Sequence, residues 1–171
     1  MAPIGFFDVA YAADAAGVAC VLADTWEAEL ALATGAKRIA LPPEPYQPGE
    51  FYRRELPLLL SLLEELHPLP RILVIDGYVW LGEAVRGLGA HLYEALGGSI
   101  PVIGVAKSRY RGDTWSAHVL RGASQRPLHV TAAGAEVSDA VAWVRRMHGA
   151  HRIPALLQQT DALSRSTLMR T

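Results

Sequence analysis

The sequence has one cysteine, no long apolar run and almost no net charge, and each shortage excludes a class of protein. Cys20 lies in the apolar run of residues 18–22, which is typical of a buried reduced thiol, and one cysteine leaves no disulfide framework within the chain. The longest apolar run, residues 56–63, is interrupted by Pro57 and Ser61 and is too short to span a bilayer. The formal net charge of −1 excludes a purely electrostatic nucleic-acid binder, although not an enzyme with a local basic surface.

Several familiar sequence signatures are also absent. The chain contains neither a Gly-x-Ser-x-Gly nucleophile elbow nor a glycine-rich phosphate-binding loop. Asp8 interrupts the only apolar stretch near the N-terminus and no basic region precedes it, so we expect no signal peptide and predict a cytoplasmic protein. The chain has 171 residues, 51% of them hydrophobic, without an internal repeat or a low-complexity linker, so residues 1–171 are expected to form one domain.

The pattern is organised around residues 72–77, Ile-Leu-Val-Ile-Asp-Gly. Four consecutive aliphatic residues indicate a strand that is buried on both faces, as in the centre of a parallel sheet. Asp76 follows at the carboxyl end of this strand, where open α/β sheets place their ligand sites. Two interpretations fit Asp76 by itself: a functional carboxylate, or a turn residue, because Asp-Gly is common in turns.

Three further acidic residues lie on other predicted elements. Asp8 falls within a predicted first strand at residues 5–11. Glu55 lies early in a predicted amphipathic helix at residues 51–66, and Asp161 lies on a predicted last helix. Each has an ordinary explanation, such as a solvent-facing strand position for Asp8 or a favourable charge near the helix N-terminus for Glu55. Carboxylates that converge from several elements on one sheet edge would instead supply the oxygen ligands that Mg²⁺ requires.

The remaining pattern predicts an α/β fold with a mixed central sheet and flanking helices. Residues 17–22 and 37–41 are predicted as the second and third strands, and their short connections predict that the first three strands pair antiparallel. Residues 72–76 and 100–107 flank an amphipathic helix, which predicts two parallel, adjacent strands joined by a crossover. Further predicted elements are strands at 115–120 and 127–131, a helix capped by Ser138 that runs through Met147, and the last helix.

Basic and aromatic residues suggest a polyanion surface. Lys107 ends the strand at residues 100–107, where it is either solvated or positioned to hold a phosphate as a point charge. Four prolines make residues 42–49 a rigid loop, from which Tyr46 would either stack on a base or pack against the prolines. Arg109 is a candidate nucleic-acid-binding residue within a basic group for which a phosphate-backbone surface and ordinary solvated loop charge are equally good explanations. That group is Lys107, Arg109, Arg111, Arg121 and Arg126.

Seven segments stand out along the chain: Phe-Asp-Val-Ala-Tyr at 7–11, Pro-Tyr-Gln-Pro-Gly at 45–49, Arg-Arg-Glu at 53–55, Val-Ile-Asp-Gly at 74–77, Pro-Val-Ile-Gly-Val-Ala-Lys at 101–107, Pro-Leu-His-Val-Thr at 127–131, and His-Arg-Ile-Pro at 151–154 with Asp161. In this order and spacing they resemble the endonuclease V family over about Phe6 to Ser164. The resemblance implies a ribonuclease H-like fold and Mg²⁺-dependent hydrolysis, with Mn²⁺ as an alternative ion. It further implies cleavage on the 3′ side of a deaminated purine, hypoxanthine (inosine), in DNA or RNA, as in DNA repair.

The resemblance also implies roles for single residues. Lys107 corresponds to a lysine near the scissile phosphate, and Gly104 belongs to the backbone that resembles the family's base pocket. Tyr46 corresponds to a wedge that fills the space left by an extruded base, with Pro45 and Pro48 beside it. The protein is expected to act as a monomer on nucleic acid that contains deaminated bases, away from membranes. The residues that correspond to the metal-binding catalytic carboxylates are Asp8, Glu55, Asp76 and Asp161.

Two positions depart from the family pattern. The family follows Asp-Gly with His-Gly-x-x-His-Pro, whereas this chain has Tyr78 and Gly82 in place of the two histidines. The segment before Asp8 is also shorter than in the family. Two hypotheses follow: an active metal-dependent endonuclease, or a nucleic-acid-binding protein that has kept the fold while its catalysis is altered or lost.

Overall fold

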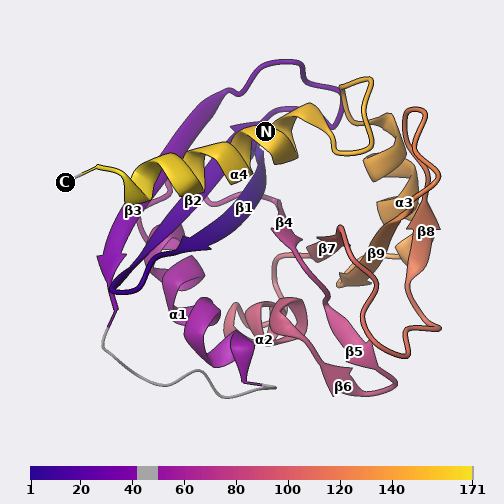
Figure 1. The fold of residues 1–171 in the computed structure, drawn as a ribbon, viewed down its shortest axis with the longest axis horizontal. Coiled ribbons are helices and arrows are strands. Elements are labelled where there is room, and N and C mark those ends of the chain that lie inside the picture. The colour runs from indigo at the N-terminus through magenta and orange to yellow at the C-terminus, as the bar shows by residue number, and fades with distance from the viewer. Residues whose placement is uncertain (42–49, 171) are drawn as a thin grey trace.

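A computed structural model of the chain, which describes residues 1–41 and 50–170, consists of a mixed sheet with helices on both faces (Figure 1). The elements in chain order are β1 (Ile4–Tyr11), β2 (Ala15–Ala23), β3 (Ala33–Ala40), α1 (Phe51–Leu63), β4 (Ile72–Asp76), β5 (Trp80–Gly82), β6 (Val85–Arg86), α2 (Leu88–Ala95), β7 (Val102–Ala106), β8 (Ala117–Val119), β9 (Leu128–Ala133), α3 (Val137–Arg146) and α4 (Ala155–Leu168).

Among residues 1–41 and 50–170, the main sheet has seven strands in the order β3-β2-β1-β4-β7-β9-β8. Its first three strands pair antiparallel, as predicted. β4 is parallel to β1 on one side and to β7 on the other, so the predicted adjacent parallel pair around α2 is also confirmed. β9 runs antiparallel to both β7 and β8. The fold is therefore the expected mixed α/β arrangement, with most strand pairs antiparallel.

Two apolar layers form the core, one on each face of the sheet. Ile4, Phe6 and Val74 lie in the layer covered by α3 and α4. Phe7 and Ile75 lie in the layer covered by α1 and α2, because successive residues of a strand point to opposite faces. Burial of each such side chain contributes about 1.5–3 kcal/mol relative to an exposed position. Figure 1 shows α4 lying along β1, β2 and β3, which brings the late helix against the first strands.

Two local features differ from the sequence prediction. The helix predicted to begin with Ser138 as its cap instead has Glu136 at the cap position, without a side-chain hydrogen bond there, so Ser138 lies within the first turn. The β5–β6 hairpin gives no periodic signal, because strands of three and two residues are too short to show alternation. Within the described part of the chain, none of the helices combines the length and apolar character needed to cross a bilayer.

Candidate active site

Three of the predicted acids and the predicted lysine meet at one edge of the sheet. Asp8 and Asp76 lie side by side, because the parallel register pairs Phe7 with Ile75, the residues directly before them. Lys107 follows β7, in which Val105 pairs with Asp76. α4 brings Asp161 to the same edge. A pocket of about 390 Å³ is lined by these four residues together with Val9, Ala10, Tyr11, Arg165 and Leu168.

Lys107 lies between two of the acids. Its Nζ is 3.1 Å from Asp76 Oδ2 and 3.9 Å from Asp161 Oδ1. The side chains of Lys107, Asp76 and Asp161 are 35%, 38% and 31% exposed, so solvent and a substrate reach all three. Ion pairs this exposed contribute only about 0–1 kcal/mol to stability, and the lysine is therefore free to exchange a carboxylate for a phosphate oxygen. Arg165 adds a second contact to Asp161, at 3.2 Å.

A hydrogen bond from Ser164 in α4 positions the Asp8 carboxylate. The buried Ser164 hydroxyl lies 2.7 Å from Asp8 Oδ2 and 2.8 Å from the Asp161 carbonyl oxygen. Burial raises the pKa of Asp8, and the hydrogen bond from Ser164 partly opposes this effect. The negative charges of Asp76 and Asp161 raise the pKa further, whereas Lys107 lowers it. Ser164 was missed in the sequence, although its position three residues after Asp161 places both on one helix face.

Glu55 approaches the acids from α1, which packs on the other face of the sheet from α4. Its side chain is 6% exposed, and it is not among the described residues that line the pocket. Burial raises the pKa of Glu55 well above its ordinary value, and the charges of Asp8 and Asp76 raise it further, so the three carboxylates interact. Glu55 Oε2 is buried without a hydrogen-bond partner among residues 1–41 and 50–170.

Tyr11 and Arg54 lie near Glu55, and neither was assigned a role from the sequence. The Arg54 guanidinium carbon lies 4.4 Å from the centre of the Tyr11 ring. Burial raises the pKa of Tyr11, with a further contribution from the charge of Glu55. The Tyr11 hydroxyl, like Glu55 Oε2, finds no hydrogen-bond partner in the described part of the chain.

The unmet requirements of this pocket fit a hard divalent cation. Burial and neighbouring acids raise the pKa values of Asp8 in the pocket and of Glu55 behind it, and a buried oxygen of Glu55 lacks a donor within the described residues. A cation would screen the repulsion and supply a partner for that oxygen. A donor set made only of carboxylate oxygens suits Mg²⁺ or Mn²⁺. The residues that could hold such an ion are Asp8, Glu55, Asp76 and Asp161.

A second carboxylate, Asp113, has a very different environment in the loop between β7 and β8. Its side chain is 2% exposed. Oδ1 accepts hydrogen bonds from the backbone N–H groups of Trp115 and Ser116, at 3.0 and 2.9 Å, and Oδ2 accepts from the Ser116 hydroxyl. Tyr78 donates its hydroxyl to Oδ2 at 2.7 Å. Burial raises the pKa of Asp113, but these hydrogen bonds outweigh it and hold the pKa well below its ordinary value.

Tyr78 therefore has a structural partner at the position where a family histidine was expected. Its ring is buried, and its oxygen also accepts a hydrogen bond from the Tyr110 backbone N–H at 3.0 Å. Burial is the main cause that raises the pKa of Tyr78. Gly82, at the second histidine position, ends β5 with a φ of 154°. Tyr78 thus holds the loop that follows Lys107.

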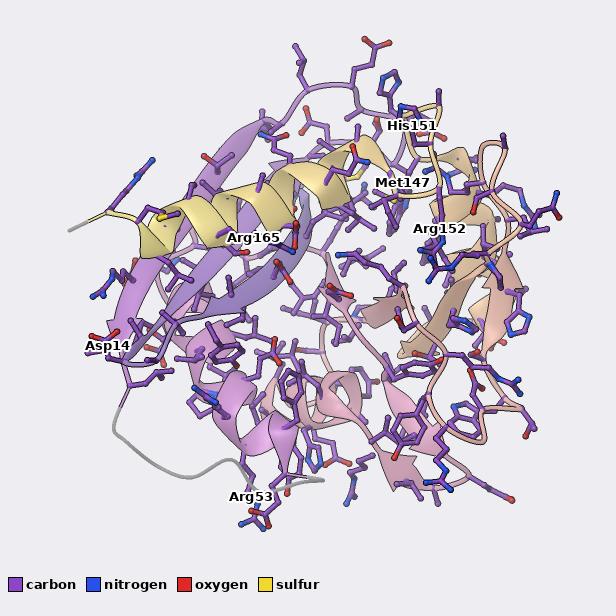
Figure 2. The ribbon with its side chains drawn as sticks, viewed as in Figure 1. Asp14, Arg53, Met147, His151, Arg152 and Arg165 are labelled. Atoms are coloured by element: carbon purple, nitrogen blue, oxygen red, sulfur yellow. The ribbon has the colours of Figure 1, made fainter. Side chains whose placement is uncertain are left out.

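The basic group divides into exposed and structural members. Arg109, Arg111 and Arg126 are exposed, although Arg109 also donates through Nε to the Asp113 backbone carbonyl at 3.2 Å. Arg121 is 7% exposed, which contradicts its assignment to a phosphate-binding surface. Its guanidinium donates hydrogen bonds to backbone carbonyls of the segment between α3 and α4, and Figure 2 labels three residues of this segment, Met147, His151 and Arg152. These carbonyls belong to Met147, Gly149, His151 and Arg152.

The predicted base-recognition residues are only partly described. Tyr46, Pro45 and Pro48 lie outside the described residues. Gly104 is buried in β7, and a Cβ there would lie 2.5 Å from the Gly77 carbonyl oxygen, so only glycine lets the loop after Asp76 cross this strand. A base-contacting role for Gly104 stays a prediction.

Solved structures define the fold class. A crystal structure of endonuclease V from Streptomyces avermitilis matches with a TM-score of 0.80 and 26% identity, over 99% of this chain and 82% of that one. Human ENDOV matches with a TM-score of 0.78 and 22% identity, over 99% and 85% of the two chains. The protein therefore has the ribonuclease H-like fold.

Sequence comparison identifies the family. A model of the family Endonuclease V matches residues 1–135, and Asp161 lies beyond that match. Endonuclease V of Streptomyces coelicolor is 32% identical, over 94% of this chain and 77% of its own length. Endonuclease V of Xylella fastidiosa (strain Temecula1) is 31% identical, over 70% of this chain and 58% of its own length. The chain belongs to the endonuclease V family.

Proposed function

We propose that this chain is a divalent-metal-dependent endonuclease that hydrolyses a phosphodiester on the 3′ side of hypoxanthine in DNA or RNA. Family membership supports nuclease activity. The observation that carries the proposal is the convergence of Asp8, Asp76 and Asp161 on Lys107 at one sheet edge. Glu55, buried behind them with an unpartnered oxygen among the described residues, fits the same metal site.

The four carboxylates would hold Mg²⁺, with Mn²⁺ as an alternative. When bound, such an ion polarises phosphoryl oxygens and lowers the pKa of a coordinated water. Lys107 would bind a non-bridging phosphate oxygen as a point charge, in exchange for its present contacts with Asp76 and Asp161. The Ser164 hydroxyl would keep Asp8 turned toward the pocket.

Substrate recognition rests on the family. A Ciona intestinalis endonuclease V that shares this fold was crystallised with DNA containing an inosine followed by a ribo-adenosine, which supports hypoxanthine as the recognised base. Lys107 starts a loop that carries exposed Arg109 and Arg111, and these side chains would track the nucleic-acid backbone. Tyr46, between Pro45 and Pro48, would act as the wedge and Gly104 would line the base pocket. We further propose a monomeric, single-domain cytoplasmic protein that takes part in nucleic-acid repair.

The second candidate is a binding protein with altered or lost catalysis. It is favoured by one observation: Tyr78, at a family histidine position, uses its hydroxyl to hold Asp113 and the Tyr110 backbone. A tyrosine at this position cannot supply the imidazole that the family histidine would provide.

A nicking assay separates the two candidates. Labelled single- and double-stranded oligonucleotides with one inosine are incubated with Mg²⁺, Mn²⁺ or EDTA, beside undamaged controls. Metal-dependent cuts 3′ of inosine are expected. Cutting that ignores inosine would retain the nuclease and overturn the proposed base. Binding without any cutting would replace the first candidate with the second.

A further inference from the structure

Three potential metal ligands outside the acid pocket come together beside the loop of residues 107–116. His118 in β8 and His129 in β9 are direct cross-strand partners, and Asp113 approaches them from the loop. One ligand atom from each of the three side chains lies within 4.8 Å of the others. We propose that Asp113, His118 and His129 form a second metal site, one that takes a transition-metal ion of the Zn²⁺ class.

The spacing of the ligand atoms is close to what such an ion requires. Zn²⁺ binds imidazole nitrogen and carboxylate oxygen at about 2.0–2.1 Å in tetrahedral geometry, which separates neighbouring ligand atoms by about 3.3 Å. Asp113 Oδ2 and His129 Nδ1 are 3.5 Å apart. His118 is exposed and can close the remaining gap by rotating its side chain. Three protein ligands leave a fourth position for water.

The donor set distinguishes this site from the acid pocket. Two imidazoles and one carboxylate suit Zn²⁺, Co²⁺ or Ni²⁺, whereas a set made only of carboxylates suits Mg²⁺ or Mn²⁺. The two sites are therefore expected to prefer different ions. This inference is independent of the proposed nuclease activity, because no residue is shared between the two donor sets.

The carboxylate of Asp113 is already oriented as a ligand. Metal-binding side chains are usually held by outer hydrogen bonds, and here Oδ1 accepts from two backbone N–H groups while Tyr78 donates to Oδ2. The Ser116 hydroxyl bonds Oδ2 and lies 3.3 Å from His129 Nδ1, so it occupies the space between the two ligands. Of the four donors to Asp113, a bound cation must therefore displace only the Ser116 hydroxyl, which can rotate away. The two backbone N–H groups and the Tyr78 hydroxyl can stay in place.

The site lies at the base of the loop and is open on one side. Asp113 and His129 are buried, and exposed His118 leaves a path for an ion from solvent. His129 pairs with Ala106, the residue before Lys107, and Asp113 lies near the other end of the loop. Because the first end of the loop is already paired through Ala106, an ion bound by Asp113 would tie its other end to the β8–β9 hairpin and restrict the loop that carries Arg109 and Tyr110.

The test is a calorimetric titration of Zn²⁺ into the full-length Asp76→Asn variant, in which the acid pocket is weakened as a competing site. One equivalent is expected to bind. His118→Ala in the same background should weaken the affinity at least about tenfold, while His151→Ala, another exposed histidine, should leave it unchanged. Co²⁺ should give the visible absorption of a tetrahedral site in the parent and lose it in His118→Ala.

His118 is exposed, so its replacement is expected to leave the thermal melt of the metal-free protein unchanged and folding is not at issue. A parent that fails to bind Zn²⁺, or a His118→Ala variant that binds as tightly as the parent, would overturn the second metal site. Either result would leave the cleavage proposal standing, because nicking depends on the other donor set.

Discussion

Asp8 and Asp113 are both shielded aspartates close to the same sheet, yet their pKa values move in opposite directions. Burial and neighbouring acids raise the pKa of Asp8, for which the Ser164 hydroxyl is a weaker, opposing influence. At Asp113 burial acts in the same upward direction, but Ser116 and Tyr78, together with backbone N–H groups, outweigh it. The hydrogen-bond donors around each carboxylate therefore decide the direction in which its pKa moves.

The two regions therefore differ in what they lack. At the acid pocket Lys107 and Arg165 contact Asp76 and Asp161, but Glu55 Oε2, buried behind the pocket, has no hydrogen-bond partner among the described residues. Asp113, in contrast, accepts hydrogen bonds from the Tyr78 hydroxyl and the Trp115 backbone N–H, and these bonds hold the loop between β7 and β8. The unpartnered oxygen of Glu55 favours the proposed cation in the acid pocket, whereas the hydrogen bonds around Asp113 hold the loop and orient this carboxylate for the proposed second metal site.

The largest effect is expected for Asp76→Asn, which should lower the nicking rate without lowering the free energy of unfolding. Asp76→Asn should reduce nicking of inosine-containing oligonucleotides at least roughly 10²–10³-fold, because it removes a charged ligand of the proposed cation, which would stabilise the charge that develops on the reacting phosphate. The variant should keep or gain stability, since it removes repulsion with Asp8 and Glu55. Parallel nicking and urea denaturation measure both.

The matched control for this change is Asp14→Asn, an exposed aspartate in the turn after β1 that Figure 2 shows at the margin of the molecule. It should cut at the parent rate. An Asp76→Asn variant with parental nicking would remove the acid pocket from the mechanism.

The converse change should affect stability. Asp113→Asn turns an acceptor of four hydrogen bonds into a group whose amide faces the hydroxyls of Tyr78 and Ser116. We expect a loss of about 2 kcal/mol in the free energy of unfolding, measured by urea denaturation, because buried donors lose their partner. The exposed Asp24→Asn is the control. Equal stability of Asp113→Asn and the parent would mean that the cluster is not a structural hub.

The opposite pKa shifts predict opposite pH dependences in metal-free protein. Because the folded-state pKa of Glu55 is raised, the folded state holds more protons than the unfolded one above the ordinary value of 4.5, and stability should fall as pH rises through that window. Glu55→Gln should remove this decline. The lowered pKa of Asp113 contributes stability above the ordinary value of 3.8, which should be lost as pH falls further.

Urea denaturation in EDTA at a series of pH values checks both slopes. If the parent and Glu55→Gln lose stability equally as the pH rises above 4.5, the raised pKa of Glu55 does not cause the decline.

The smallest expected effect concerns the residue that replaces a family histidine. Tyr78→Phe removes the hydrogen bond to Asp113 and should cost about 1 kcal/mol of unfolding free energy. Tyr110→Phe, at an exposed ring, should cost less. A Tyr78→Phe variant no less stable than Tyr110→Phe would show that the tyrosine does not hold the loop.

Much of the fold and part of the site follow from sequence for a physical reason. The aliphatic run that ends at Asp76 indicates a strand buried on both faces, and the short connections near the N-terminus predict the antiparallel pairing of the first three strands, which is confirmed. The last helix expected to carry Asp161 is also confirmed, as α4. Sequence patterns report which residues of a strand or helix are buried. They can therefore place an acidic residue on a strand or helix.

Other features depend on how the chain folds back on itself. Asp113 is surrounded by donors from a loop and from Tyr78, at a separation no local pattern encodes. Arg121 resembles any surface arginine until backbone carbonyls between α3 and α4 enclose it. Ser138 matched the preferred cap residue, but the helix begins before it, with Glu136 at the cap. The convergence of Glu55 with the aspartates likewise needs the packing of α1.

The most direct test of the acid pocket as a cation site is a calorimetric titration of Mg²⁺ into metal-free protein, with Glu55→Gln and Asp14→Asn beside it. Saturable binding is expected for the parent and for Asp14→Asn, with affinity at least about tenfold weaker in Glu55→Gln. A parent that binds no Mg²⁺, or a Glu55→Gln variant that binds it as tightly as the parent, would rule out a cation site formed by these carboxylates.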